Sequence, residues 1–198
     1  MQLREINTRT DDWELRAEKV LSHFQYEFPD EIDMHSICWR YGIKVMPLDV
    51  PFTEQYVDYE VISHLESFSI PSSKARRGTI YLKENLGHIE RKLLLAEEFC
   101  HLYAHNASQL PIDTYSLAKL ENQAKRMSAY LLMPARFIST VYDAALDEAV
   151  LISDIADHFV VTEEFAHYRM ELIFNRRVDA LMTHRGALGT IEWLNKDY

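Results

Sequence analysis

The scarcity of residues that interrupt regular structure is the strongest constraint on the fold. The chain of 198 residues contains only five glycines and six prolines, so few tight turns are available and most segments should be helical. Hydrophobic residues make up 47% of the chain and charged residues 26%, a composition typical of a folded protein and too apolar for intrinsic disorder. A chain of this length buries roughly two-thirds of its unfolded surface, so it needs neither disulfides nor a metal to fold.

The charge balance limits the classes of partner. The 21 Lys and Arg residues and 31 Asp and Glu residues give a net charge of −10. A nucleic-acid duplex repels such a chain at long range unless a basic patch overrides the field, so we expect no direct binding to nucleic acid. The sequence shows neither a signal peptide nor an apolar run long enough to cross a bilayer. We therefore expect a cytoplasmic protein with no membrane partner.

The N-terminal part, about residues 11–83, predicts short helices and a small sheet. Asp11 stands three residues before Glu14, as in a capping box, and predicts the start of the first helix. A second helix over roughly 30–41 should stop at Gly42, a natural left-handed position. Further along, the apolar patterns predict a strand at 43–46, weaker strand signals at 61–70 and a half-exposed strand at 79–83.

The rest of the chain predicts helices. We expect two long helices within about 88–134 and three shorter helices within about 135–185. The tail after Arg185 carries no clear signal. These patterns predict a single α+β domain over residues 1–198, with a small sheet placed before a helical half.

The polar residues of the helix expected over 88–105 have the spacing of a metal site. Glu97, His101 and His105 are four residues apart and therefore share one face of a helix. In the HExxH motif of zincins, two ligands at this spacing hold one metal, and the Glu between them polarises the attacking water. Here the pattern is Glu97-Glu98-x-x-His101, with a carboxylate in place of the first histidine. Such patterns are also common on solvated helix faces, which is the alternative interpretation.

A further carboxylate falls on a helix face that should be apolar. Glu121 lies within a stripe of apolar residues made up of Leu117, Leu120, Ala124, Met127 and Leu131. A carboxylate in such a stripe costs free energy unless a metal, an Arg or backbone donors satisfy it, although a Glu at the edge of the stripe could extend into solvent. A metal shared by Glu97, His101 and Glu121 explains the polar residues of both helices.

These two helices resemble those of a known family. The run Arg91-Lys-Leu-Leu-Leu-Ala-Glu-Glu-Phe-Cys-His-Leu-Tyr-Ala-His105 and the run Glu121-Asn-Gln-Ala-Lys-Arg-Met-Ser-Ala-Tyr-Leu-Leu-Met-Pro134 look like the metal-site helices of the ImmA/IrrE metallopeptidases. The resemblance extends over most of residues 13–175, and the Leu-Leu-Met-Pro block is its most specific part. It implies a zincin-like α+β domain with a small sheet, a pair of metal-site helices and a C-terminal segment similar to a helix-turn-helix.

The resemblance also implies roles for individual residues. Glu98 matches the general base, and Glu97, His101 and Glu121 match the metal ligands, with Zn²⁺ or another divalent metal as the implied cofactor. His105 matches a histidine often found one turn past the motif, where it would support a ligand. Glu97 stands where the family has its first zinc histidine. Carboxylate oxygen can bind zinc, but two carboxylates make the site more anionic, less selective for zinc and worse at lowering the pKa of bound water.

The implied function is that of a zinc-dependent regulatory endopeptidase. Proteins of this type cleave a repressor-like transcription factor and so release a mobile-element or stress programme, which makes a transcriptional repressor the expected partner and substrate. The half-exposed strand at 79–83 would pair with an extended substrate through Thr79 and Tyr81, as edge strands do. A Tyr or His commonly assists the oxyanion in such sites, and Tyr103 and His105 lie nearby in sequence.

Two other functions stay open. A relative that has lost catalysis would bind the same kind of partner without cutting it. Residues 151–170 also have the pattern of a helix-turn-helix, with Thr162 as the cap of its second helix. That helix begins with Glu163 and Glu164, which would face phosphates with the wrong sign, so we favour a structural role for the pair. The apolar spacing of Cys100 predicts a packed thiol and not a nucleophile.

Overall fold

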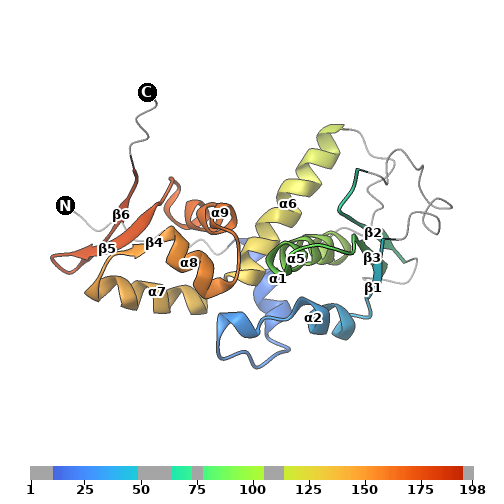
Figure 1. Cartoon of the computed structure of the whole chain (residues 1–198), viewed down its shortest axis with the longest axis horizontal. Coiled ribbons are helices and arrows are strands. Elements are labelled where there is room, and N and C mark those ends of the chain that lie inside the picture. Colours follow the sequence, from blue (N-terminus) through green and yellow to red (C-terminus); the bar gives the residue numbers. More distant parts are fainter. Residues whose placement is uncertain (1–10, 49–63, 73–77, 105–113, 194–198) are drawn as a thin grey trace. The chain divides into compact units, whose positions relative to one another are not determined.

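The protein is an α+β chain that divides into two compact units (Figure 1). The computed structural model describes residues 11–48, 64–72, 78–104 and 114–193, without the side chains of 114–116. One unit comprises residues 33–128, and the other comprises residues 1–32 and 129–198. Within the described ranges, no helix is both long and apolar enough to span a bilayer.

A three-stranded sheet and two helices form the framework of the unit at 33–128. The strands are β1 (Lys44–Pro47), β2 (Ser67–Pro71) and β3 (Gly78–Leu82), in the order β1-β3-β2. Strand β3 is parallel to β1 and antiparallel to β2. The helix α5 (His88–Ala104) packs against β2 and β3, and α2 (Met34–Arg40) packs against α5. The long helix α6 (Thr114–Leu132) starts in this unit.

The central position of β3 corrects one prediction. Residues 78–82 pair with β1 on one side and with β2 on the other, so the strand has no free edge there for an extended substrate. Nor does its burial alternate, because Ile80, Tyr81 and Leu82 are all buried. The expectation of a half-exposed edge strand is therefore wrong. Alternating residue types do not show that a short strand is covered on both faces.

Local signals determine where α2 begins and ends. The carboxylate of Asp33 accepts hydrogen bonds from the backbone N–H groups of His35 and Ser36, which caps the helix N-terminus. At the other end Gly42 has a φ of 69°, which confirms the predicted left-handed stop. The helix begins later than expected from sequence because Pro29–Glu31 forms a separate 3-10 turn, η1.

The second unit combines helices with a small antiparallel sheet. Its elements, besides η1, are α1 (Asp12–Leu21), α7 (Ala135–Asp147), β4 (Val150–Leu151), α8 (Ile152–Phe159), α9 (Glu163–Phe174), β5 (Ala180–His184) and β6 (Ala187–Ile191). The strands have the order β4-β5-β6. Three helices follow Pro134 as predicted, but the strands β5 and β6 were not predicted. Their turn consists of Arg185 and Gly186, both with positive φ, and Arg is an unusual first residue for such a turn.

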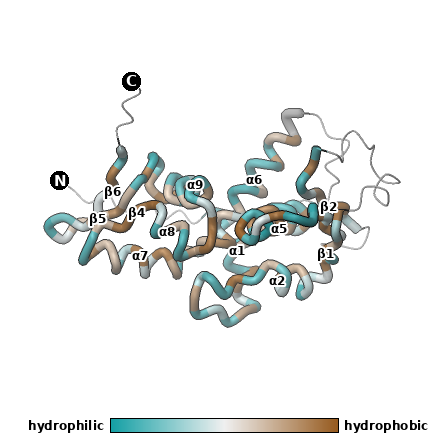
Figure 2. The backbone as a smooth tube through the Cα atoms, viewed as in Figure 1, coloured by the Kyte–Doolittle hydropathy of each residue, from teal (hydrophilic) through white to brown (hydrophobic). Residues whose placement is uncertain are grey.

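Caps and amphipathic faces hold the helices of this unit in place. The side chain of Asp11 caps α1 at the N–H of Trp13, and that of Thr162 caps α9 at the N–H of Phe165, which confirms both predicted caps. Figure 2 shows hydrophobic and hydrophilic residues alternating along α7. This alternation gives the helix one side for the core and another for solvent.

A buried arginine holds the end of α6 in place. The Nε of Arg169 donates a hydrogen bond of 2.9 Å to the carbonyl oxygen of Met133, within the Leu-Leu-Met-Pro block. Its Nη2 lies 3.3 Å from the carboxylate of Glu14, and the guanidinium lies over the ring of Tyr130. The ion pair and hydrogen bond offset part of the cost of burying the Arg169 charge, and burial still lowers the pKa of its guanidinium.

Candidate metal centre

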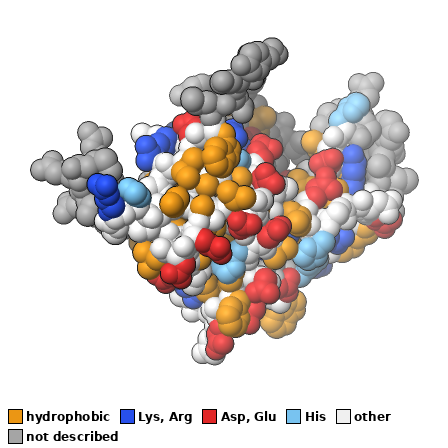
Figure 3. Space-filling view, turned by 60° about the vertical axis from the view of Figure 1, so that its left-hand side comes forward, with side chains coloured by type: hydrophobic (Ala, Val, Ile, Leu, Met, Phe, Trp, Pro, Cys, Tyr) orange, Lys and Arg blue, Asp and Glu red, His pale blue; other side chains and the backbone are white. Residues whose placement is uncertain are grey.

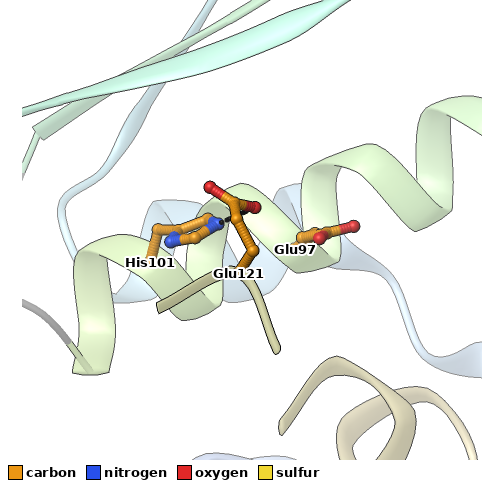
Figure 4. Close-up of side chains that lie close together, drawn as sticks. All are labelled: Glu97, His101 and Glu121. Carbon is orange, nitrogen blue, oxygen red and sulfur yellow. Dashed lines mark hydrogen bonds and ion pairs between the residues drawn. The ribbon is translucent and has the colours of Figure 1, made fainter. Parts of the chain in front are cut away.

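Two helices supply the candidate ligands. Glu97 and His101 lie one turn apart on α5, and Glu121 lies on α6 (Figure 4). The Nε2 of His101 is 3.1 Å from a carboxylate oxygen of Glu121. One ligand atom from each of the three residues lies within 4.8 Å of the other two. The structure thus brings together the three residues that the sequence assigned to the metal.

The donor set fits a divalent cation. An imidazole nitrogen and carboxylate oxygens are accepted zinc ligands at about 2.0–2.2 Å, which places the ligand atoms of one tetrahedral ion about 3.4 Å apart. The 4.8 Å limit is somewhat wider, so the carboxylates of Glu97 and Glu121 have to rotate toward the ion. Both residues are only partly buried, which leaves room for that rotation.

Burial and neighbouring charge shift the pKa values of the ligands. Burial raises the pKa of Glu97, the carboxylates of Glu121 and Glu98 raise it further, and His101 and Lys125 oppose the shift. Burial lowers the pKa of His101, but the hydrogen bond and charge of Glu121 raise it more, so the net shift is upward. A metal ion binds a neutral imidazole, so a proton and a metal cation compete for the Nε2 of His101.

Glu98 lies in the same cleft as the three ligands and is hydrogen-bonded to the sheet. Its side chain is only 7% exposed, and its Oε1 accepts a hydrogen bond of 2.9 Å from the hydroxyl of Ser67. Burial raises the pKa of Glu98, and the hydroxyls of Ser69 and Ser67 oppose this shift. Its Oε2 is buried and has no hydrogen-bond partner among the described residues. A carboxylate of this kind is well suited to accept a proton.

Ser67 and Ser69 were not predicted as site residues. They occupy alternate positions of β2, and side chains at alternate positions of a strand point to the same face. The weak strand signal at 61–70 could have suggested this shared face. Nothing in the sequence, however, pairs Ser67 with a glutamate 31 positions away.

A cleft of about 520 Å³ lies over this cluster. Its lining residues are His64, Leu65, Glu66, Ser67, Phe68, Ser69, Leu94, Glu97, Glu98, His101, Leu117 and Glu121. The candidate base and all three candidate ligands therefore share one solvent-accessible space. A cleft of this size is within the range of about 300–1,000 Å³ that binds small ligands.

Other predicted site residues lie elsewhere. Thr79 and Tyr81 do not line this cleft but a separate pocket beside Gly42 and Lys44, which corrects their predicted role in holding an extended substrate at the site. Tyr103 packs among aromatic rings, stacked on Phe99, and does not line the cleft either. His105 lies outside the described residues.

Cys100 is a packed thiol. It is fully buried in α5, and burial raises its pKa well above the ordinary range of a cysteine. The buried Cys38 has its pKa raised to about 12 for the same reason. Thiols in such surroundings are poor nucleophiles.

A comparison with models of known protein families identifies the family of this chain. The family model Peptidase_M78, described as the IrrE N-terminal-like domain, matches residues 38–171. The chain belongs to this family. This confirms the resemblance to the ImmA/IrrE metallopeptidases, and the metal dependence of Peptidase_M78 proteins agrees with the possible ion site at Glu97, His101 and Glu121.

Comparison with solved structures shows a shared fold. A Mycobacterium tuberculosis transcriptional regulator aligns with 81% of this Peptidase_M78 chain at a TM-score of 0.52 and 15% identity. The alignment covers 47% of that regulator, so the chain spans about half its length. No curated protein matches the chain.

Proposed function

We propose that the protein is a metal-dependent endopeptidase that cuts a protein partner in the cytoplasm. One observation carries this proposal: the three candidate ligands lie close together in the same cleft as the buried carboxylate of Glu98. A ligand cluster next to a candidate base is what hydrolysis of a peptide bond requires. Membership of a peptidase family supports the same reaction class.

Each residue has a role in this proposal. Glu97, His101 and Glu121 hold the ion, which we expect to be zinc, and the bound ion supplies Lewis-acid polarisation of the reacting groups. Ser67 fixes one oxygen of Glu98 by its hydrogen bond, while Oε2 keeps its capacity to accept. Glu98 takes a proton from the attacking water and passes it to the leaving amine.

The substrate strand is expected beside β2. Among the described strands, β2 pairs with β3 alone, and its first residues line the cleft. An extended segment can add to such an edge through backbone hydrogen bonds. We propose a transcriptional repressor as the substrate, which would give the protein a role in regulating transcription, for example of a mobile element.

Cleavage of a peptide library tests the proposed reaction. The zinc-loaded protein is incubated with peptides prepared from a cell proteome, and new termini are identified by mass spectrometry. We expect cleavage that a chelator stops and that Glu98→Gln abolishes, because the amide cannot take the proton. Glu18→Gln, a matched change at an exposed residue of α1, should cleave like the parent. Equal cleavage by Glu98→Gln would contradict the proposed base.

A regulator that binds without cutting is the second candidate. The observation that favours it is Glu97, because a second carboxylate offsets the charge of a bound ion and weakens its effect on water. Under this alternative the parent releases no new termini from the library, yet still binds a repressor through the same cleft.

A further inference from the structure

We propose that the cleft selects an extended peptide segment carrying a Lys or Arg close to an aliphatic residue. This inference rests on the proposed function, since it takes the cleft as the place where a polypeptide binds. It concerns the class of segment that is recognised, and the proposed reaction itself does not specify that class.

The charge of the cleft is the first argument. Four of its lining residues are carboxylates, Glu66, Glu97, Glu98 and Glu121, and none of the described lining residues is a Lys or Arg. A bound divalent ion balances two negative charges, which leaves two in excess. Low-dielectric walls concentrate the field of such charges, so a cationic side chain is attracted and an anionic one is repelled.

The buried carboxylate of Glu98 strengthens this argument. It is 7% exposed, lines the cleft, and its Oε2 has no hydrogen-bond partner in the described part of the chain. A charge on such a buried carboxylate is screened less than one in water, so it contributes strongly to the potential in the cleft. The negative potential therefore originates inside the cleft as well as at Glu66, which is exposed.

Apolar residues also line the cleft. Leu65, Leu94 and Leu117 line the same space as the carboxylates. Leu94 lies one turn before Glu97 and Glu98 on α5, and Leu117 lies one turn before Glu121 on α6. Apolar and acidic residues are therefore neighbours in the cleft, and together they match an aliphatic side chain with a Lys or Arg close to it.

Attraction of a cationic peptide by the cleft has to be distinguished from its attraction by the acidic surface as a whole. Acidic side chains are spread over the face shown in Figure 3, in keeping with the net charge of −10. Any cationic peptide is attracted weakly to such a protein. The test therefore compares two charge reversals that change the net charge equally, one inside the cleft and one outside it.

Fluorescence anisotropy with three labelled peptides provides this test. The peptides share one length and one central Leu, and the residues flanking it are Lys, Gln or Glu. Each peptide is titrated with the parent, with Glu66→Lys and with Asp143→Lys, in chelator so that nothing is cut. Asp143 is exposed on α7 and does not line the cleft.

We expect the parent to bind the Lys peptide about tenfold more tightly than the Glu peptide at low salt, with the Gln peptide between them. Glu66→Lys should reduce this preference roughly three- to fivefold, and Asp143→Lys should leave it nearly unchanged. Equal binding of the three peptides overturns the inference. An equal loss with both variants also overturns it, because the preference would then come from net charge.

The same peptides separate this inference from the proposed function. After zinc is added, mass spectrometry shows whether the Lys peptide is cut. A peptide that binds with the expected preference but stays intact supports the class of ligand and counts against hydrolysis. Cleavage of all three peptides at equal rates supports hydrolysis and counts against the selection of cationic segments.

Discussion

Glu97 determines how the candidate metal centre differs from an ordinary zinc site. It gives the site two carboxylates and one imidazole, where a zincin helix offers two imidazoles. Oxygen donors favour harder ions, and imidazole favours zinc. The substitution therefore changes the preference among metals and the charge of the cleft, while the positions of His101 and Glu121 can stay the same.

Restoring the histidine is expected to strengthen zinc binding. In Glu97→His a second imidazole replaces a carboxylate, so the affinity for zinc should rise at least about tenfold, equivalent to about 1.4 kcal/mol. Isothermal titration of chelator-stripped protein with zinc measures this change. Glu97→Gln, which has a poor ligand at the same position, should bind zinc more weakly than the parent. An unchanged affinity in Glu97→His would show that residue 97 does not face the ion.

Some residues of the site could be predicted from the sequence, and others could not. The ligands on α5 follow from the spacing of Glu97 and His101 within one helix, and Glu121 stood out as a charge in an apolar stripe. Ser67 could not be found in this way, because its hydrogen bond to Glu98 depends on how β2 packs on α5.

At the scale of elements, the cap of α2 makes stability dependent on pH. Burial raises the pKa of Asp33, but hydrogen bonds from Ser36 and His35 lower it more, so the net shift is downward. A lowered pKa in the folded state stabilises the protein above the pKa of the unfolded state, and this contribution is lost as the pH falls through the folded value.

Replacing this cap should remove both the stability and its pH dependence. Asp33→Ala is expected to cost about 1 kcal/mol at neutral pH, measured by urea unfolding. The difference from the parent should shrink toward the acid end of a pH series. Asp33→Asn keeps the capping oxygen and should cost less. A stability deficit of Asp33→Ala that is constant from neutral to acidic pH would show that the ionised Asp33 carboxylate does not stabilise α2.

The close approach of β2 and β3 requires a glycine. A Cβ added at Gly78 would meet the carbonyl oxygen of Ile70 and would lie 2.9 Å from a methyl carbon of Leu102. We expect Gly78→Ala to destabilise the protein by about 1–3 kcal/mol, because the backbone has to move. Gly189→Ala in β6 serves as the control, since its nearest neighbour would be 3.5 Å away. Equal unfolding midpoints for the two variants would show that β2 and β3 are less closely packed.

Sequence patterns predicted where helices and strands lie along the chain better than which of them pack together. Asp11, Gly42 and Thr162 mark helix ends because a cap acts within one turn. The order β1-β3-β2 depends on contacts between distant segments, so the pattern at 79–83 showed a strand but not its central place. The strands β5 and β6 were missed because Arg185 does not signal a turn.

At the scale of the whole molecule, the similarity to the family covers much more of the chain than the candidate site. The family match covers residues 38–171, and the two compact units each include part of that range. A single domain over 1–198 stays a prediction. The α+β class was predictable because few glycines and prolines favour helices and the short apolar runs lie early in the chain.

Metal binding should stabilise the folded chain as a whole. An ion that binds only the folded state adds about 2.7 kcal/mol to the free energy of unfolding at a concentration 100 times its Kd. Urea unfolding with and without zinc measures this gain. Glu121→Gln removes one ligand and should lose most of the gain, while Asp143→Asn should keep it. A parent protein whose unfolding does not respond to zinc or to any other divalent ion would contradict the proposal.

Anomalous X-ray diffraction from crystals soaked with zinc shows directly whether Glu97, His101 and Glu121 hold one ion. We expect a single strong anomalous peak for a zinc ion that is bonded to His101 Nε2 and to carboxylate oxygens of Glu97 and Glu121, at about 2.0–2.2 Å from each. Crystals that bind zinc only elsewhere, with these three side chains turned away from one another, would contradict it.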